Sequence, residues 1–347
     1  MTEPATPGQI VISGSIATDH LMTFPGLISD QLLPDQLTKV SLSFLVDGLK
    51  IRRGGVGANI ALGLGRLGLR PLLVGAAGAD HGEYDDWLRA NGVDTRGVLT
   101  VPGQYTARFL CTTDRAQNQI ASFHPGAMSR AADISLPEVL GRTGPARLVL
   151  IGADDPAAML RRTAECRVAG LPFAADPSQQ LARLTGDQVR TLVDGARWLF
   201  SNAYERSLLL ERTGLTGAEL LARVGTWFTT LGADGVLIER QGEPPIEVRP
   251  PRELRRADPT GVGDAFRAGV LAGEVWGLPL PVAARVGCLL ATLALESVGT
   301  QEYVYRPEDF LRRLAEAYGG ETAELVRPHV AAKTGGRSSV VGDSMAG

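Results

Sequence analysis

The residues best suited to chemistry lie in segment 257–269, where two glycines and an aspartate precede an apolar helical pattern. Prolines and charges interrupt the chain just before this segment, as is typical of a loop that opens a helix. Gly261 and Gly263 have no Cβ, so a ligand can approach their backbone closely. The unpaired N–H groups and positive dipole end of the new helix favour an anion. We therefore predict a phosphate site, with Gly261, Val262 and Gly263 as its anion hole.

Asp264 decides whether such a site only binds phosphate or also transfers it. A carboxylate beside an anion site is repelled by the ligand, which suggests a task such as accepting the proton of a hydroxyl that attacks phosphorus. The alternative is a helix cap, because Asp is favoured in the first turn of a helix. The spacing leaves both interpretations open.

Strands and helices must hold this segment in place, and after residue 145 the two alternate. The expected strands are 148–152, 172–176, 198–202, 227–231 and 236–240. Such alternation predicts an α/β fold with a doubly wound, mostly parallel sheet flanked by helices. Polar residues gather where these strands end, at 176–180, 202–205 and 229–232. An active face built from many loops follows.

The first part of the chain adds another strand end and a glycine pair. Residues 9–14 are typical of a buried strand, and Asp19 follows its carboxyl end, where ligands bind in open α/β sheets. Its carboxylate can accept two hydrogen bonds from a cis-diol, although a turn or helix cap is the ordinary alternative. Gly54 and Gly55 allow close approach of a ligand, and Asn59 offers a donor and an acceptor to hydroxyl groups.

Two further segments predict a small antiparallel β lid outside the main sheet. Residues 39–46 alternate polar and apolar side chains, and residues 105–112 and 119–123 are typical of a hairpin. Its aromatic residues could stack on a flat ligand, although such residues more often belong to a core. We expect one domain over residues 1–330, with lid segments near 20–52 and 104–125. The Gly- and Ser-rich residues 331–347 are expected to form a flexible tail.

Composition excludes several classes of protein. The chain has 347 residues, enough to bury a large core, and a formal net charge of −3. No basic field is available for nucleic acid or an anionic membrane. The cysteines and histidines lack metal-ligand spacing, and no apolar run is long enough to cross a bilayer. We therefore expect a cytoplasmic protein without structural zinc. The lysines are Lys39, Lys50 and Lys333, and none follows a glycine loop, which argues against P-loop and protein-kinase chemistry.

Five segments in order resemble the signatures of the ribokinase-like (PfkB) family of carbohydrate and nucleoside kinases. They are Gly14 with Asp19, and residues 54–59, 202–205, 230–232 and 258–264. Segments 14–22, 39–47 and 176–184 are similar to those of its bacterial adenosine kinases of the actinobacterial type. The resemblance covers roughly residues 9–318. It implies a ribokinase-like fold and transfer of the γ-phosphate of ATP to the 5′-hydroxyl of adenosine, giving AMP and ADP in purine salvage.

The resemblance also implies roles for individual residues. Asp264 would be the catalytic base, and Glu205 would orient Mg²⁺ through water, with a first-turn helix glutamate as its alternative. The residues implied to bind ATP are Asn202, Thr230 and Gly232. The residues implied to bind the nucleoside are Ser15, Asp19, Gly55, Asn59, Phe109, Phe123, Met128, Gln179, Gln180 and Arg183. Val262 replaces the family's usual alanine, and the resemblance leaves a K⁺ requirement open.

Two alternatives to adenosine phosphorylation stay open at this point. The acceptor could be a free sugar such as ribose or fructose, or inosine or guanosine, although Gln179, Gln180 and the lid aromatics favour an acceptor with a base. A nucleoside-binding regulator without catalysis is the other, and Asp264 and Glu205 argue against it. An exposed apolar face of the lid would suit a homodimer.

Overall fold

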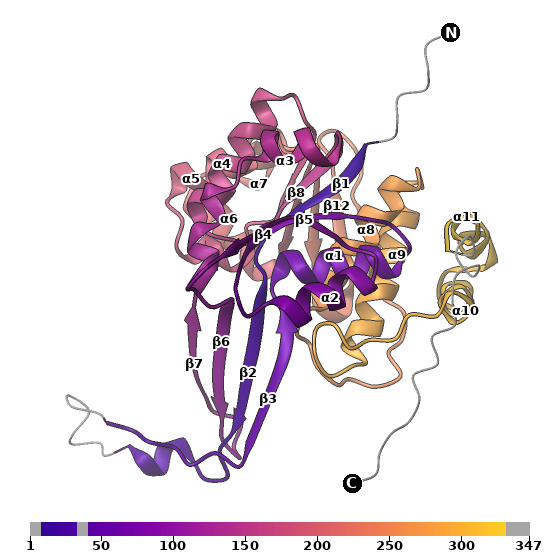
Figure 1. Ribbon diagram of the computed structural model, residues 1–347. Helices are drawn as coiled ribbons and strands as arrows, with labels where there is room; N and C mark the ends of the chain where they lie inside the picture. The colour runs from indigo at the N-terminus through magenta and orange to yellow at the C-terminus, as the bar shows by residue number, and fades with distance from the viewer. Residues whose placement is uncertain (1–7, 33–40, 331–347) are drawn as a thin grey trace.

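A computed structural model describes residues 8–32 and 41–330 of the protein, and these form an α/β body with a protruding lid (Figure 1). The body is built on one nine-stranded sheet within the described residues. The strands from β11 to β5 are parallel, as the alternating pattern predicts. In spatial order the strands are β13 (Ile246–Val248), β12 (Val236–Glu239), β11 (Thr226–Thr230), β10 (Trp198–Asn202), β9 (Phe173–Ala175), β8 (Ala146–Ile151), β1 (Gln9–Ser13), β4 (Leu72–Gly78) and β5 (Asp94–Val101).

Helices cover both faces of this sheet, and each face has its own hydrophobic core. Alternate side chains of the strands point to opposite faces, so neighbouring residues such as Val11 and Ile12 belong to different cores. One face is covered by α1 (Val56–Arg66), α2 (Gly82–Ala90), α8 (Val262–Val275), α9 (Leu280–Leu295), α10 (Pro307–Tyr318) and α11 (Gly320–Val330). The other is covered by α3 (Leu136–Thr143), α4 (Pro156–Val168), α5 (Gly186–Val193), α6 (Ala203–Thr213) and α7 (Gly217–Leu221).

One strand of the alternating series runs against the others. Strand β12 pairs antiparallel with β11, and β13 pairs antiparallel with β12. A parallel neighbour needs a crossover of a dozen or more residues, whereas an antiparallel one needs only a short turn. The short 3-10 helix η5 (Gly232–Asp234) and Gly235, with φ of 95°, supply that turn. The sheet is therefore mostly, not wholly, parallel.

The lid is a separate sheet with the order β3-β2-β6-β7 in the described residues. Strand β2 pairs antiparallel with β3 but parallel with β6, so the lid is mixed rather than antiparallel throughout. Both β2 and β6 leave the carboxyl ends of parallel body strands, β1 and β5, and therefore run in the same direction. The predicted hairpin is confirmed as β6 and β7. The lid strands are β2 (Ala17–Thr23), β3 (Gly48–Gly54), β6 (Ala107–Thr113) and β7 (Gln119–His124).

The predicted lid strand at 39–46 is wrong in the part that the structure describes. Residues 41–46 form no strand, and residues 39 and 40 lie outside the described ranges, as do residues 331–347. Strand β2 ends at Thr23, which pairs with Gly48, and Ala17 pairs with Gly54. All seven residues of β2 are thus paired with residues 48–54, and Leu45 is left 89% exposed. The alternation at 41–44 reflects a connection without strand pairing in which Leu42 and Phe44 are half-buried, and Phe44 packs against Phe24 with ring centroids 4.9 Å apart.

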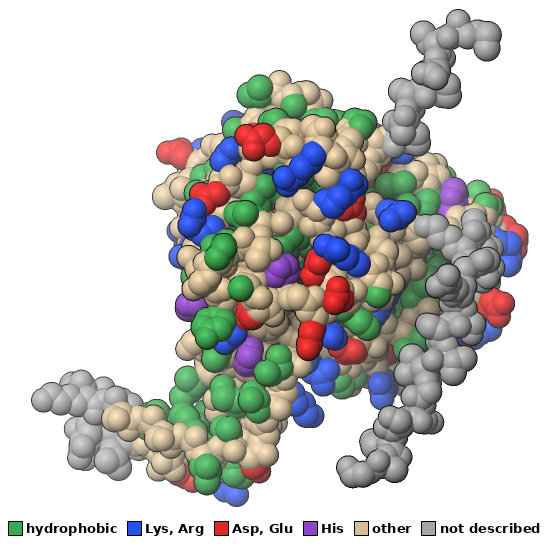
Figure 2. Space-filling view, viewed as in Figure 1, with side chains coloured by type: hydrophobic (Ala, Val, Ile, Leu, Met, Phe, Trp, Pro, Cys, Tyr) green, Lys and Arg blue, Asp and Glu red, His purple; other side chains and the backbone are tan. Residues whose placement is uncertain are grey.

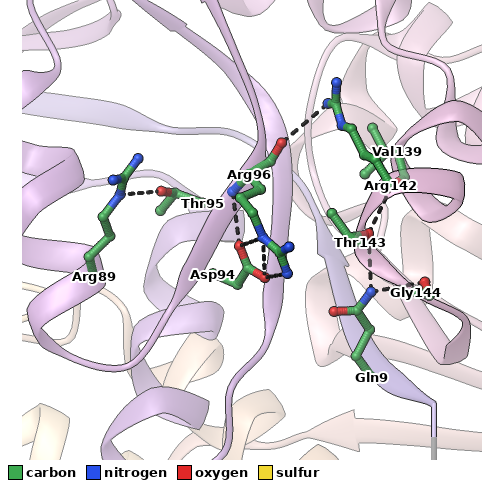
Figure 3. A network of polar contacts seen from close by, with 9 residues as sticks. All are labelled: Gln9, Arg89, Asp94, Thr95, Arg96, Val139, Arg142, Thr143 and Gly144. Atoms are coloured by element: carbon green, nitrogen blue, oxygen red, sulfur yellow. Dashed lines mark hydrogen bonds and ion pairs between the residues drawn. The ribbon is translucent and has the colours of Figure 1, made fainter.

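A polar network lies at the amino ends of the parallel strands, on the side of the sheet away from the lid (Figure 3). The Asp94 carboxylate accepts the backbone N–H of Arg96 at 3.0 Å and also binds its guanidinium. Gln9, the first residue of β1, donates to Thr143 Oγ1 and to the carbonyl of Gly144. These contacts lie at the amino ends of the parallel strands, so the carboxyl ends and their loops face the lid.

Candidate active site

The predicted anion hole lies at the start of α8, which begins as the sequence suggests. Gly261 is the N-cap with φ of 78°, a left-handed conformation that suits glycine. A Cβ on Gly261 would lie 2.9 Å from Thr300 Cβ, and one on Gly263 would lie 2.7 Å from Arg267 Nη1. Backbone conformation and packing therefore require glycine at 261, whereas a side chain at 263 would have to move the end of the Arg267 side chain. First-turn N–H groups have no intrahelical partner and carry the positive end of the dipole, so an anion is favoured here.

Asp264 is half-buried in the first turn of α8 and is held by Asn59 of α1. Asn59 Nδ2 donates to Asp264 Oδ2 at 2.8 Å. The Asn59 amide is itself fixed, because its Oδ1 accepts from Gln301 Nε2 at 2.9 Å and lies 3.1 Å from Thr300 Oγ1. Burial raises the pKa of Asp264 to about 6, against the opposing effects of Arg267 and Asn59. The orientation of the carboxylate is thus fixed, and its pKa allows it to act as a base near neutral pH.

The first of two cavities at the carboxyl edge of the sheet lies under the lid. This lid cavity has a volume of about 520 Å³ and includes Gly261 and Asp264 in its lining. It also brings together all ten residues that the resemblance assigned to the nucleoside, from five separate parts of the chain: Ser15, Asp19, Gly55, Asn59, Phe109, Phe123, Met128, Gln179, Gln180 and Arg183.

The second cavity, which we call the loop cavity, lies between the loops after β10 and β11 and helices α8 and α9. Its volume is about 490 Å³. The residues assigned to ATP, Asn202, Thr230 and Gly232, line it together with Val262 and Gly263. Segment 259–264 therefore borders both cavities, with Gly263 in one and Asp264 in the other. A group held at the anion hole would sit between them.

The lid strands carry charged and aromatic side chains on the face that lines the lid cavity. Asp19 of β2 lies opposite Arg52 of β3 and beside Phe109 of β6, and Phe109 lies opposite Phe123 of β7. All four line the lid cavity. Burial raises the pKa of Asp19 to about 6, and the charge of Asp258 adds to the effect. A carboxylate so poorly solvated gains from hydrogen-bond donors such as a diol.

Glu205 has a clear structural role. Its Oε2 accepts the backbone N–H of Asn202 at 2.8 Å, and Asn202 Oδ1 accepts the N–H of Glu205 at 2.8 Å. The two residues form the capping box of α6. Glu205 Oε1 also accepts from Ser178 at 3.4 Å. These contacts agree with the alternative interpretation of Glu205 as a first-turn helix glutamate. The predicted role of Glu205 toward Mg²⁺ stays a prediction.

A buried ion pair beneath the site was missed by sequence reasoning. Arg267 Nη2 donates to Asp176 Oδ1 at 2.7 Å, and Arg267 Nε lies 2.6 Å from Asp176 Oδ2. The two side chains are only 6% and 0% exposed. The pair links α8, one turn after Asp264, to the loop after β9 that carries Gln179 and Gln180. A charged residue inside an otherwise apolar helix start was the signal that could have found it.

The fold and the site together define an α/β protein in which a glycine-rich helix start lies between two cavities at the carboxyl ends of the parallel strands. Residues 17–305 match the model of the pfkB family of carbohydrate kinases. The protein belongs to this family and is an ATP-dependent phosphotransferase. In the described ranges no helix combines the length and hydropathy needed to cross a bilayer, and no cluster of three or more His, Cys, Asp or Glu side chains could hold a metal.

Several relatives in this family are nucleoside kinases. The chain is 29% identical over 290 residues to the nucleoside kinase of Methanothermobacter thermautotrophicus, covering 83% of this chain and 92% of the relative. The nucleoside kinase of Burkholderia thailandensis in complex with inosine is 33% identical, with a TM-score of 0.79, and the match covers 89% of this chain and 98% of that one. Its complex with ADP and inosine is 34% identical, with a TM-score of 0.77, over 89% of this chain and 96% of that one.

Proposed function

We propose that the protein is a nucleoside kinase that transfers the γ-phosphate of ATP to the 5′-hydroxyl of adenosine. The observation that carries the proposal is the shared border at segment 259–264. This segment presents its anion hole to the loop cavity and a fixed carboxylate to the lid cavity. A phosphoryl group at the anion hole would be within reach of a hydroxyl that Asp264 deprotonates.

Each part of the site would contribute a separate step. ATP binds in the loop cavity, with Mg²⁺ supplied with the nucleotide and oriented through water near Glu205. The nucleoside binds in the lid cavity and its hydroxyl transfers a proton to Asp264 Oδ1, since Oδ2 is held by Asn59. The amides at the start of α8 stabilise the charge that develops on the moving phosphoryl group. The lid excludes water, which would otherwise accept that group.

The lid cavity favours a nucleoside over a free sugar because it has a place for a base. Phe109, Phe123 and Met128 supply apolar surface, and two glutamines lie beside them. Gln180 is only 6% exposed, and its Oε1 has no hydrogen-bond partner in the described part of the chain. An unpaired buried acceptor is costly, and the 6-amino group of adenine would supply its donor.

An acceptor panel tests this assignment. ADP release should be fastest with adenosine, slower with inosine and guanosine, and absent with ribose or fructose. The second candidate, a kinase for inosine or guanosine, is supported by the inosine complex of the Burkholderia thailandensis relative. A preference for inosine would establish that candidate, and a preference for free sugar would overturn both. Adenosine binding without ATP consumption would instead indicate a regulator.

The partner proposed for the lid is a second copy of the protein. Alternation along the strands puts Leu49, Ile51, Leu110 and Ile120 on the face of the lid away from the cavity, and three of them are more than 40% exposed. Figure 2 shows hydrophobic side chains gathered on this part of the lid. Sedimentation should give a dimer, and Ile51→Glu should give a monomer.

A further inference from the structure

Arg52 connects the lid to the turn after α9 in the body. It lies on β3 with its half-buried side chain in the lining of the lid cavity. Its Nη1 donates to the carbonyl oxygen of Val298, in the turn after α9, at 3.0 Å. A Cβ on Gly299 would come within 2.8 Å of Arg52 Nη1, so a glycine there leaves room for the guanidinium. The contact joins two segments about 250 residues apart in the chain.

The same turn is bound to the anion hole by a short series of contacts. Gly299 N donates to Asp258 Oδ2 at 3.0 Å, and Thr260 N donates to Asp258 Oδ1 at 2.9 Å. Thr300 packs against Gly261, the N-cap of α8, and its hydroxyl donates to the carbonyl of Arg53, the neighbour of Arg52, at 2.8 Å. Arg52 and Arg53 of β3 therefore both contact the turn at 298–300, and this turn contacts the loop that precedes Asp264.

A monovalent cation, the cofactor that the family resemblance raises for this neighbourhood, does not fit these residues. Such an ion competes with hydrogen-bond donors for the lone pairs of the surrounding oxygen atoms, and it is repelled by a fixed positive charge. Both carboxylate oxygens of Asp258 already accept backbone N–H groups, and the carbonyl of Val298 accepts from Arg52. Burial opposes the shift, but the pKa of Asp258 is lowered by the hydrogen bonds from Thr260 and Gly299 and, to a smaller extent, by the positive charge of Arg52. A second cation at this place would be repelled by the guanidinium of Arg52.

We propose that Arg52 is a positioning residue that holds the anion hole from the lid, in the place of a bound monovalent cation. Its guanidinium fixes the turn at 298–300, and that turn fixes the loop at 258–261. The inference rests on the proposed phosphoryl transfer at this site. Because Arg52 belongs to the lid, displacement of the lid would break the contact, so the anion hole would be complete only when the lid is in the position seen here.

Kinetics of Arg52→Ala in different salts test the proposal. The unaltered protein should have the same kcat in KCl as in choline chloride. Arg52→Ala should lower kcat by about tenfold or more, as expected for loss of one charge-assisted hydrogen bond. KCl or added guanidinium should restore part of this loss, and Arg52→Lys should lose less. Lys50→Ala is the matched control, since Lys50 lies two residues away on the same face of β3, and it should keep full activity.

Binding measurements separate this proposal from the assigned reaction. Calorimetric titration with a non-hydrolysable ATP analogue should show weaker binding to Arg52→Ala in choline chloride, with recovery in KCl. Strong activation of the unaltered protein by K⁺, or unchanged kinetics in Arg52→Ala, would overturn the proposal while leaving the kinase function intact. A loss in Arg52→Ala that neither K⁺ nor guanidinium relieves would also overturn the replacement of a cation. Absence of kinase activity in the unaltered protein would refute the proposed function itself.

Discussion

The two cavities that meet at the start of α8 are of similar size but differ in their lining. The lid cavity places charged groups, Asp19, Arg52 and Asp264, around its interior. The loop cavity combines an apolar wall, which includes Phe266, Ala291 and Leu295, with the charged residues Arg252, Glu253 and Arg256, of which the two arginines are exposed. Fixed polar groups orient a ligand, whereas an apolar wall selects it mainly by shape. Substitution of the fixed charged groups in the lid cavity should therefore alter turnover, whereas substitution of an apolar residue in either cavity should alter mainly the affinity for the ligand of that cavity.

The largest expected effect is on stability, at the ion pair beneath the junction of the two cavities. Arg267→Met leaves the Asp176 carboxylate buried without a partner, which should destabilise the fold by about 3–5 kcal/mol. Arg267→Met with Asp176→Leu should recover most of that free energy. Urea unfolding measures both. Arg223→Met removes an exposed ion pair with Asp194 and should cost at most about 1 kcal/mol. Equal effects of the two single variants would contradict the structural importance of the buried pair.

The next effect separates catalysis from helix capping at Asp264. Asp264→Asn should keep acceptor binding but lower kcat by about 10²-fold or more, because the general base is lost. Steady-state kinetics and calorimetry measure the two quantities. Asp187→Asn is a matched control, since Asp187 is also a first-turn acid, in α5, and does not line either cavity. Near-normal turnover in Asp264→Asn would show that Asp264 acts as a helix cap and not as the catalytic base.

Activity should also fall in acid, because the two carboxylates of the lid cavity must be ionised. The pKa values of Asp264 and Asp19 are both raised to about 6, chiefly by burial, so protonation begins well above the usual range of Asp. The limb of kcat/KM below pH 6 should approach a slope of two, and Asp19→Asn should reduce the slope to one. A limb that begins only near pH 4 would show that neither pKa is raised.

Local patterns in the sequence were sufficient for the fold, whereas most of the residues assigned to the site came from the family resemblance. Strand ends with polar residues and a glycine-rich helix start are contiguous features, so Asp19, Asn59 and Asp264 could be placed near one another. The contacts of Arg52 and Arg267 could not be found in this way, because their partners, Val298 and Asp176, are distant in sequence and are selected by packing. The strand predicted at 39–46 failed for a related reason, since pairing partners rather than alternation determine which residues form a strand.

The smallest effects sharpen the contrast between the cavities themselves. Phe123→Ala should raise the KM for the nucleoside severalfold, as loss of about 0.5–1.5 kcal/mol of aromatic stacking implies, and should leave the KM for ATP unchanged. Leu295→Ala, in the loop cavity, should do the reverse. Initial rates with each substrate varied in turn measure both constants. If Phe123→Ala altered the KM for ATP and not that for the nucleoside, the assignment of the two cavities would have to be exchanged. A change in both constants in either variant would mean that the two cavities are coupled through segment 259–264. The contact between Arg52 of the lid and Val298 is the physical link through which such coupling would pass.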